Sequence, residues 1–504
     1  MSFNKPASYV SFKPVPSSSR GTNTPQRITP RASRAPLASL LFLAAVTSSC
    51  GARSSLSERT PHPETCNGLD DDGNGIIDDV PPMTCGVGAC RVEVPGCVDG
   101  RPSTCTPRAP SPEVCNGVDD DCNGAIDDGL GFGSIAGPFT VATTPPGILG
   151  ASLVATANGL LAVWSVGFNG SAPVPNTFSR VLDPDGIPQG SPAGLLPQRS
   201  VPVGPRAAPS AEDEVILGYC GRFGAEDRAT STRVTATGEP IGPEIQREPK
   251  GRSCTGISAP SAVWTGTRQL FAWTTNAASP SLPPEVVLDV ADASGTSVGF
   301  RSILEDADGD ATARLAVNGA SAALIAGTRA PGGVATRLAF ALLDQEGQSL
   351  GSPLVIDPPV AGGSWGRTEI AAAASGGFIA LGGNRDEPGI FRALFSASGA
   401  LVEPPAQLEG MALTVDAITL ALAAREGGGF VLVSNAIEGA DARAFAMALS
   451  DDGRVTGTWF ADAPDEPWFF SPSVATRAGR VFVLYQTVMT QPSELRVREL
   501  GCLP

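Results

Sequence analysis

Two short segments of this 504-residue chain concentrate the residues whose types and spacing suit metal binding. They run from Glu64 to Asp79 and from Glu113 to Asp128, and they align with each other without a gap. We number each loop from the first residue of its triple Asp. Residues with side-chain oxygens then occupy alternate positions and a glycine at position six permits a sharp turn, as in the first three quarters of an EF-hand calcium loop. The predicted metal ligands are Asp70, Asp72, Asn74, Asp78 and Asp79 in the first loop and Asp119, Asp121, Asn123, Asp127 and Asp128 in the second.

The end of each loop departs from an EF-hand, because its twelfth position is Pro or Leu where a bidentate Glu is usual. A further oxygen would come from Asp79 and Asp128, or from the upstream Glu64 and Glu113. The Ile at position eight is expected to anchor the far side of the loop. Hard oxygen ligands favour Ca²⁺ over Zn²⁺ or copper, and two loops predict about two ions per chain.

The role expected for these ions is structural, because the loops are too small and too acidic to fold on a core of their own. The alternative is an acidic Asn-Gly turn that only keeps the surface soluble. Since a second copy aligns without a gap, metal binding is the favoured interpretation.

The string Cys-Asn-Gly-x-Asp-Asp-Asp-Cys-Asn-Gly-x-x-Asp-Asp at 115–128 resembles the MopE-type metal-binding motif, which repeats in secreted and surface-anchored bacterial proteins. The stretch from Cys85 to Cys105 resembles the cysteine-rich spacer between copies of that motif. The resemblance covers residues 64–129 only. It implies metal binding and a surface location, and it identifies no reaction.

The first copy departs from the motif at Gly73, which replaces the second Cys. Cys66 therefore lacks the local partner that is available to Cys115. The copper associated with the family's namesake suits this chain poorly, because His62 is its one histidine.

The first fifty residues have the pattern of an export signal. Residues 1–35 carry basic residues and no acid, and the apolar run from Leu37 to Val46 is too short to span a bilayer. Small residues before Cys50 resemble a bacterial lipobox, in which Cys50 carries the lipid and becomes the mature N-terminus. Residues 1–50 are therefore predicted to be a signal peptide, followed by a linker over 51–63. The expected location is the outer membrane or cell surface, with plain secretion as the alternative.

Cysteine usage agrees with export. The chain has 11 Cys, and removing Cys50 for the lipid leaves an even number, densest between Cys85 and Cys122. No Cys-x-x-Cys pair occurs, so a disulfide framework is favoured over zinc. Cys220 and Cys254 are expected to pair locally, and the remaining connectivity stays open. The disulfide candidates are Cys66, Cys85, Cys90, Cys97, Cys105, Cys115, Cys122, Cys220, Cys254 and Cys502.

From about residue 131 the chain repeats. Apolar runs recur about every fifty residues, from Leu160–Trp164 to Val481–Tyr485, and all but the last of them are followed by a second strand ending in a glycine turn. Four short strands per repeat are typical of a β-propeller blade. The last repeat lacks one strand, which the segment Gly133–Thr143 would supply, and this closure removes an open sheet edge. A pair of β-sandwiches with coincidental spacing is the alternative.

The predicted fold is therefore all-β: a seven-bladed β-propeller over residues 131–504, preceded by a small disulfide-rich segment with two calcium loops over 64–130. A disordered N-terminal signal region comes before that segment.

Composition excludes several functions. The formal net charge of -16 argues against nucleic-acid binding, and a single histidine argues against Ser-His-Asp, Cys-His and multi-histidine sites. The nucleophile-elbow match at Gly362–Gly366 has neither a following helix nor a nearby base. Asp306–Asp310 could form a third calcium turn, although a solvated loop is the simpler interpretation.

These observations lead us to expect a non-enzymatic cell-surface protein that presents its propeller to an extracellular protein or polysaccharide and touches the membrane only through a lipid anchor. One alternative is a hydrolase or lyase that uses carboxylates in the propeller channel, which needs no histidine. The other is a metal-acquisition or buffering protein. Consistent paired acids in the repeats would favour the enzyme, and none are evident.

Overall fold

The computed structural model describes residues 63–113, 118–124, 131–144, 148–166, 176–196, 204–223, 226–247, 254, 259–275, 284–305, 307, 312–329, 336–360, 363–384, 389–408, 414–415, 420–438, 441–460, 472–487 and 493–503. The predicted signal region, with Cys50, lies outside them. Within these ranges the chain is all-β apart from two 3-10 turns, η1 (Gly88–Cys90) and η2 (Ala211–Asp213). No helix of this described part is long and apolar enough to cross a membrane.

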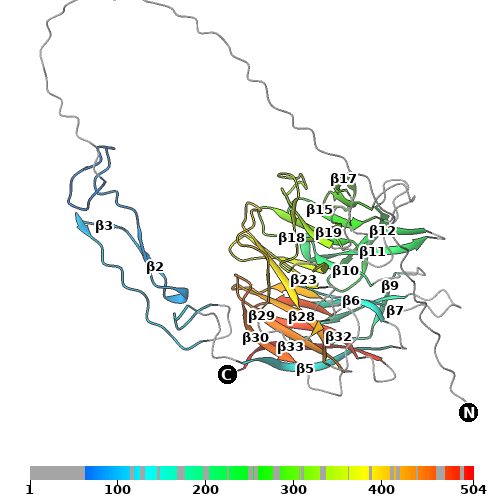
Figure 1. Cartoon of the computed structure of the whole chain (residues 1–504). Coiled ribbons are helices and arrows are strands. Elements are labelled where there is room, and N and C mark those ends of the chain that lie inside the picture. Colours follow the sequence, from blue (N-terminus) through cyan, green and yellow to red (C-terminus); the bar gives the residue numbers. More distant parts are fainter. Residues whose placement is uncertain are drawn as a thin grey trace, which may run out of the picture. The chain divides into compact units, whose positions relative to one another are not determined.

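A seven-bladed β-propeller follows residue 131, as the repeat predicts (Figure 1). The first three blades are β6 (Ile148–Thr156), β7 (Gly159–Val166), β8 (Thr177–Leu182), β9 (Ala193–Leu196); β10 (Arg206–Pro209), β11 (Glu214–Phe223), β12 (Glu226–Thr235), β13 (Pro240–Gln246); and β14 (Ser261–Trp264), β15 (Gln269–Thr274), β16 (Val286–Ala291), β17 (Ser297–Leu304). The next two are β18 (Arg314–Val317), β19 (Ala322–Arg329), β20 (Thr336–Leu343), β21 (Leu354–Ile356); and β22 (Trp365–Ala372), β23 (Phe378–Asn384), β24 (Ile390–Phe395), β25 (Ala406–Gln407). The last two are β26 (Thr414–Val415), β27 (Ala421–Ala424), β28 (Phe430–Glu438), β29 (Asp441–Leu449), β30 (Val455–Phe460); and β31 (Ser473–Arg477), β32 (Arg480–Thr487), β33 (Ser493–Leu503), β5 (Gly131–Thr144).

The ring closes through a strand from its own N-terminal end, which confirms the predicted closure. β5 pairs antiparallel with β33, with Gly131 opposite Leu503 and Thr144 opposite Ser493. Figure 1 shows the cyan β5 beside the orange-red β33. The seventh blade therefore combines both ends of the propeller sequence, and β5 covers the edge that β33 would otherwise expose.

The recurring apolar runs are the second strands of the blades, and both faces of these strands are buried. Leu160 and Ala162 of β7 pack in the core shared with the seventh blade, whereas Leu161 and Val163 pack in the core shared with the second blade. Because side chains alternate along a strand, one continuous apolar run fills two interfaces between blades. The same alternation recurs around the ring.

The turn glycines that mark the repeat are sites of close contact between blades. Gly347 has φ +70°, and a Cβ there would lie 2.9 Å from Leu270 Cδ2 and from Val290 Cγ2 of the preceding blade. Arg301 of that blade donates to the Glu346 carbonyl at 3.2 Å and also to the Gly347 carbonyl. Only glycine suits both the left-handed conformation and the space.

The innermost strands line the propeller channel. In order these are β6, β10, β14, β18, β22, β27 and β31, and each neighbours the next, with β31 neighbouring β6. Ser152, Ser261 and Ser473 help to join them, because each hydroxyl accepts the backbone N–H of the next blade's innermost strand.

The cysteine-rich segment contains little regular structure: β1 (Met83–Cys85) pairs with β2 (Val92–Val94), and β3 (Cys97–Val98) pairs with β4 (Arg101–Pro102). Disulfides hold it instead of a core. They join Cys66 to Cys97, Cys85 to Cys105 and Cys90 to Cys122.

The propeller carries a disulfide of its own. Cys220 pairs with Cys254, which confirms the expected local pairing. Cys502 is also disulfide-bonded, and Cys115 lies outside the described residues.

Candidate functional sites

Each acidic loop is organised around the carboxylate of its upstream glutamate. Glu64 Oε2 accepts the backbone N–H groups of Asp71 and Asp72 at 3.1 and 3.2 Å, and its Oε1 accepts that of Asp78 at 3.1 Å. Asp70 accepts N–H groups from the following turn, including that of Gly75 at 3.0 Å. These bonds fold the loop back so that carboxylates distant in sequence converge.

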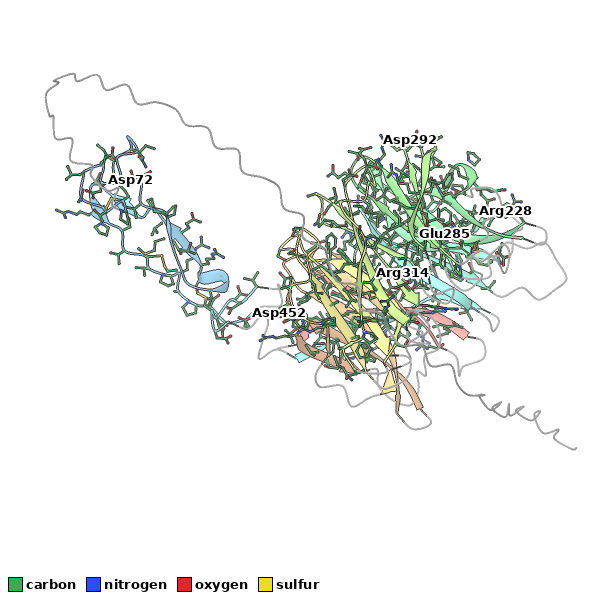
Figure 2. All side chains as sticks on the ribbon, turned by 45° about the horizontal axis from the view of Figure 1, so that its top comes forward. Asp72, Arg228, Glu285, Asp292, Arg314 and Asp452 are labelled. Atoms are coloured by element: carbon green, nitrogen blue, oxygen red, sulfur yellow. A yellow bond between two sulfur atoms is a disulfide. The ribbon has the colours of Figure 1, made fainter. Side chains whose placement is uncertain are left out.

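The result is a cluster of three carboxylates, Glu64, Asp70 and Asp72, with one oxygen from each lying within 4.8 Å of the others. Figure 2 labels Asp72 in this segment. In the part of the segment that the structure describes, the donors to these oxygens are backbone amides and the Asn74 side chain, without a cationic group. Such an arrangement of like charges is what a hard cation stabilises.

The second loop repeats the cluster with Glu113, Asp119 and Asp121. Glu113 Oε1 accepts the N–H groups of Asp120 and Asp121 at 2.7 and 2.9 Å. Its Oε2 is inaccessible to solvent and has no hydrogen-bond partner among the residues that the structure describes. A buried carboxylate oxygen without a donor fits metal ligation, because leaving it unsatisfied is costly.

Other predicted ligands lie outside the clusters. Asp78 accepts the N–H groups of Asn67 and Gly68 at 2.8 and 2.9 Å, so it closes the loop rather than joining the cluster. Asp79 accepts the Asn74 amide at 2.9 Å. In the second loop Asn123 donates to Asp119 and Asp121 through its backbone N–H. Asp127 and Asp128 lie outside the described residues.

The structure tests the roles expected for the glycine at position six and for the isoleucine at position eight of the loops. The glycine at position six does adopt the left-handed conformation, with φ +94° at Gly75 and +93° at Gly124. Ile77, however, is 62% exposed. Its expected role as an apolar anchor is wrong, because this loop has no core beneath it to receive the side chain.

A second polar cluster, which no motif in the sequence predicts, lies in the propeller channel. Glu369 of β22 accepts Arg314 Nε of the neighbouring β18 at 2.9 Å. It also accepts Nη1 and Nη2 of Arg206 at 3.2 and 2.5 Å. Since β10 and β22 are separated by two innermost strands, the Arg206 contact crosses the channel. Figure 2 labels Arg314 among the strands of the propeller.

Burial and charge shape the ionisation of this cluster. Burial raises the pKa of Glu369, but the charges and hydrogen bonds of Arg206 and Arg314 together more than offset it, so the pKa is lowered. Burial lowers the pKa of Arg314 to about 10, and the positive charge of Arg206 adds to this effect. Glu369 and Arg314 are therefore both charged at neutral pH.

The nucleophile-elbow match is structural. Ser364 is buried, and its hydroxyl accepts the Thr336 N–H at 2.8 Å. Strand β22 begins at the next residue, so the strand-to-helix turn of a nucleophile elbow is missing here.

Comparison with protein families agrees with the loop geometry. The copper-binding MopE family model, described as a metal-binding motif, matches residues 61–79 and 107–128. The segment carries this motif. Its two matches include both carboxylate clusters. The motif and the disulfides agree with an exported protein. No curated protein matches the chain.

Solved structures match the propeller. The α-L-arabinofuranosidase Arb93A from Fusarium graminearum is 10% identical over 74% of this chain and 97% of its own, with a TM-score of 0.41. Polysaccharide lyase Uly1 is 11% identical over 73% of this chain and 92% of its own, with a TM-score of 0.44. The Hadza microbial sialidase Hz136 is 13% identical over 68% of this chain and 76% of its own, with a TM-score of 0.42.

These matches contradict the expectation of a non-enzymatic binding protein, because the matched propellers are named as a glycosidase, a lyase and a sialidase. The expectation rested on the lack of paired acids that recur consistently in the repeats. That reasoning was wrong, because the blades surround one channel and a site there can draw single residues from non-equivalent blades. Glu369, Arg206 and Arg314 come from non-equivalent blades and meet in this way. The available signal was an arginine at the first position of two short innermost strands, Arg206 of β10 and Arg314 of β18.

Proposed function

We propose that the chain is an exported enzyme, a carboxylate-dependent hydrolase or lyase that acts on an extracellular polysaccharide in the propeller channel. The observation that carries the proposal is the ionised Glu369, held by two arginines that come from different blades. A carboxylate with a lowered pKa is suited to stabilising positive charge or attacking as a nucleophile, rather than to donating a proton.

A hydrolase of the two-carboxylate type needs a second acid. The sequence places Asp308 and Asp310 shortly before Arg314, at the start of the strand that contacts Glu369. These two aspartates lie outside the described residues, and we propose them as the candidates for the second carboxylate.

The test is an activity screen of the full chain on neutral and acidic polysaccharides. New reducing ends indicate cleavage, and ultraviolet absorbance of an unsaturated product separates a lyase from a hydrolase. Glu369→Gln should abolish product formation, whereas Arg454→Gln, whose side chain is 81% exposed, should leave it unchanged. Asp308→Asn and Asp310→Asn test the second acid. Product formation by Glu369→Gln at the wild-type rate would refute the proposal.

We propose that the two acidic loops bind Ca²⁺ and that the ions stabilise the cysteine-rich segment. Carboxylate oxygens are hard ligands, and the thiols of the described segment are consumed in disulfides, which favours Ca²⁺ over copper. Calorimetric titration of the chelator-stripped protein with Ca²⁺ and with Cu²⁺ should show about two Ca²⁺ sites. A preference for Cu²⁺ would contradict the assignment.

We also propose that Cys50 carries the lipid anchor, which would place the enzyme at the cell surface. Mass spectrometry of the mature N-terminus distinguishes a lipidated Cys50 from a cleaved, unmodified chain.

A further inference from the structure

Cys502, near the end of β33, is disulfide-bonded. Four disulfides join eight of the 11 Cys to one another, and Cys502 is not among these eight. The two other cysteines that remain are Cys50 and Cys115. The partner of Cys502 within the chain is therefore one of these two.

The pairing of Cys122 leaves no partner for Cys115 in the cysteine-rich segment. Cys122 is the cysteine nearest to Cys115 in the sequence, but it pairs with Cys90 at a sequence separation of 32. The other described cysteines of this segment pair among themselves. A disulfide of Cys115 must therefore reach beyond the segment.

Cys502 lies at the seam where the propeller ring closes. It is opposite Phe132 of β5, and the next residue of β33 is opposite Gly131, with which β5 begins. The span from Cys115 to Gly131 is short and consists mainly of the second acidic loop, whereas Cys50 precedes the whole cysteine-rich segment. Because the entropic cost of joining two residues grows with the chain between them, this placement favours Cys115 over Cys50. The lipid anchor proposed above would also occupy the sulfur of Cys50.

We infer that Cys115 forms a disulfide with Cys502, which attaches the second acidic loop to the seventh blade at both of its ends. The disulfide holds one end to β33, and the backbone of the other end continues into β5, which pairs with β33. The loop therefore bridges the two strands that close the ring.

Formation of this bond is an oxidation that suits an exported protein. Cys115 and Cys502 each lose an S–H bond and together gain one S–S bond. The two electrons and two protons pass to the disulfide of an oxidant in the exported compartment, which becomes a pair of thiols.

The attachment couples the metal loop to ring closure. A cation held by Glu113, Asp119 and Asp121 orders the loop, and a loop tied to both strands then restrains β5 against β33. This coupling rests on the metal binding proposed above, whereas the disulfide does not depend on it.

The closure seam is a place where such a restraint has a large effect. Every other blade consists of consecutive strands, but β5 and β33 come from opposite ends of the propeller sequence. Their register also shifts at three places between Leu495 and Leu500. In the chain-entropy model a disulfide that closes a long loop restricts the unfolded chain more than Cys220–Cys254, whose sequence separation is 34.

Peptide mapping of the unreduced full chain tests the disulfide. The protein is isolated from an exported fraction, its free thiols are blocked, and the monomer is taken from a non-reducing gel. Cleavage after arginine and before aspartate places Cys115 in the peptide 109–118 and Cys502 in the peptide 499–504, each without a second cysteine. We expect these two peptides to be linked and to separate on reduction. Linkage of Cys502 to Cys50, or a blocked Cys502 thiol, would overturn the inference.

A double variant tests the coupling. All tryptophans of the chain lie in the propeller sequence, so their fluorescence reports the melting of the propeller. Cys115→Ala with Cys502→Ala should lower this melting temperature by about 3–5 °C and abolish the rise that Ca²⁺ produces in it. Cys220→Ala with Cys254→Ala is the matched control, because it removes a propeller disulfide away from the acidic loop and should keep the Ca²⁺ effect.

The outcomes separate this inference from the proposed metal binding. An equal Ca²⁺ effect in the Cys115 and Cys502 double variant and in the wild type would overturn the coupling. Titration without any bound Ca²⁺ would overturn the proposed metal sites and the coupling, while a mapped link between 109–118 and 499–504 would still establish the disulfide.

Discussion

Replacing Glu369 by glutamine tests whether the channel cluster is held by charge. The substitution keeps the shape of the side chain and removes the negative charge shared by Arg206 and Arg314. Removing one partner from a buried ion pair costs about 3–5 kcal/mol, because the other charge stays buried without compensation. Since glutamine still offers one acceptor oxygen, we expect Glu369→Gln to lower the free energy of unfolding by about 3 kcal/mol.

The same geometry predicts a smaller effect for Arg206. Its side chain is 37% exposed, so water screens its contribution, and Arg206→Gln should cost about 1 kcal/mol or less. The order of the two variants is therefore set by burial rather than by the number of hydrogen bonds. Adding Arg314→Met to Glu369→Gln removes the stranded charge and should recover part of the lost stability.

The dependence on pH gives an independent check. Glu369 has a pKa below its ordinary value of 4.5, so its stabilising contribution is fully present above pH 4.5 and is lost as the pH falls through the lowered pKa. The stability difference between wild type and Glu369→Gln should therefore shrink in acid.

The assay is urea unfolding of the full chain in Ca²⁺, followed by the fluorescence of the buried Trp164, Trp273 and Trp365, which report on the propeller. If Glu369→Gln costs no more than Arg206→Gln, or if its effect does not change with pH, the reasoning from buried charge is refuted.

Three further predictions concern other parts of the chain. Asp119→Asn should abolish one Ca²⁺ site in a titration and reduce the calcium-induced rise in the melting temperature of the cysteine-rich segment. An unchanged number of bound Ca²⁺ ions would show that Asp119 is not a ligand. Reduction should expose that segment to protease before the propeller, since Cys90–Cys122 and its companions replace a core there, and unchanged cleavage would contradict this. Gly347→Ala should lower stability by about 2 kcal/mol in urea unfolding because it adds overpacking to backbone strain. Gly190→Ala, also at positive φ but in open space, should cost about 1 kcal/mol, and equal losses would show that the contact between blades is unimportant.

Much of the fold follows from local patterns in the sequence. Runs such as Leu160–Trp164 have both faces apolar because the second strand of each blade packs against both neighbouring blades. The number of such runs in the sequence therefore predicts the number of blades. The glycine turns and the strand-like Gly133–Thr143 segment predict the remaining strands and the closure with β33. The paired acidic loops are equally local, since the backbone amides that Glu64 and Glu113 accept lie within fifteen residues of each glutamate.

The channel cluster could not be predicted in this way. Arg206, Arg314 and Glu369 are 55 or more residues apart, and no pattern within a repeat links them. They meet only because seven sheets close into a ring, which places the innermost strands β10, β18 and β22 around one channel. The sequence determines which residues alternate within a blade. Ring closure determines which residues from different blades lie together in the same low-dielectric interior. Because charges interact more strongly there, this placement determines their ionisation and their chemistry.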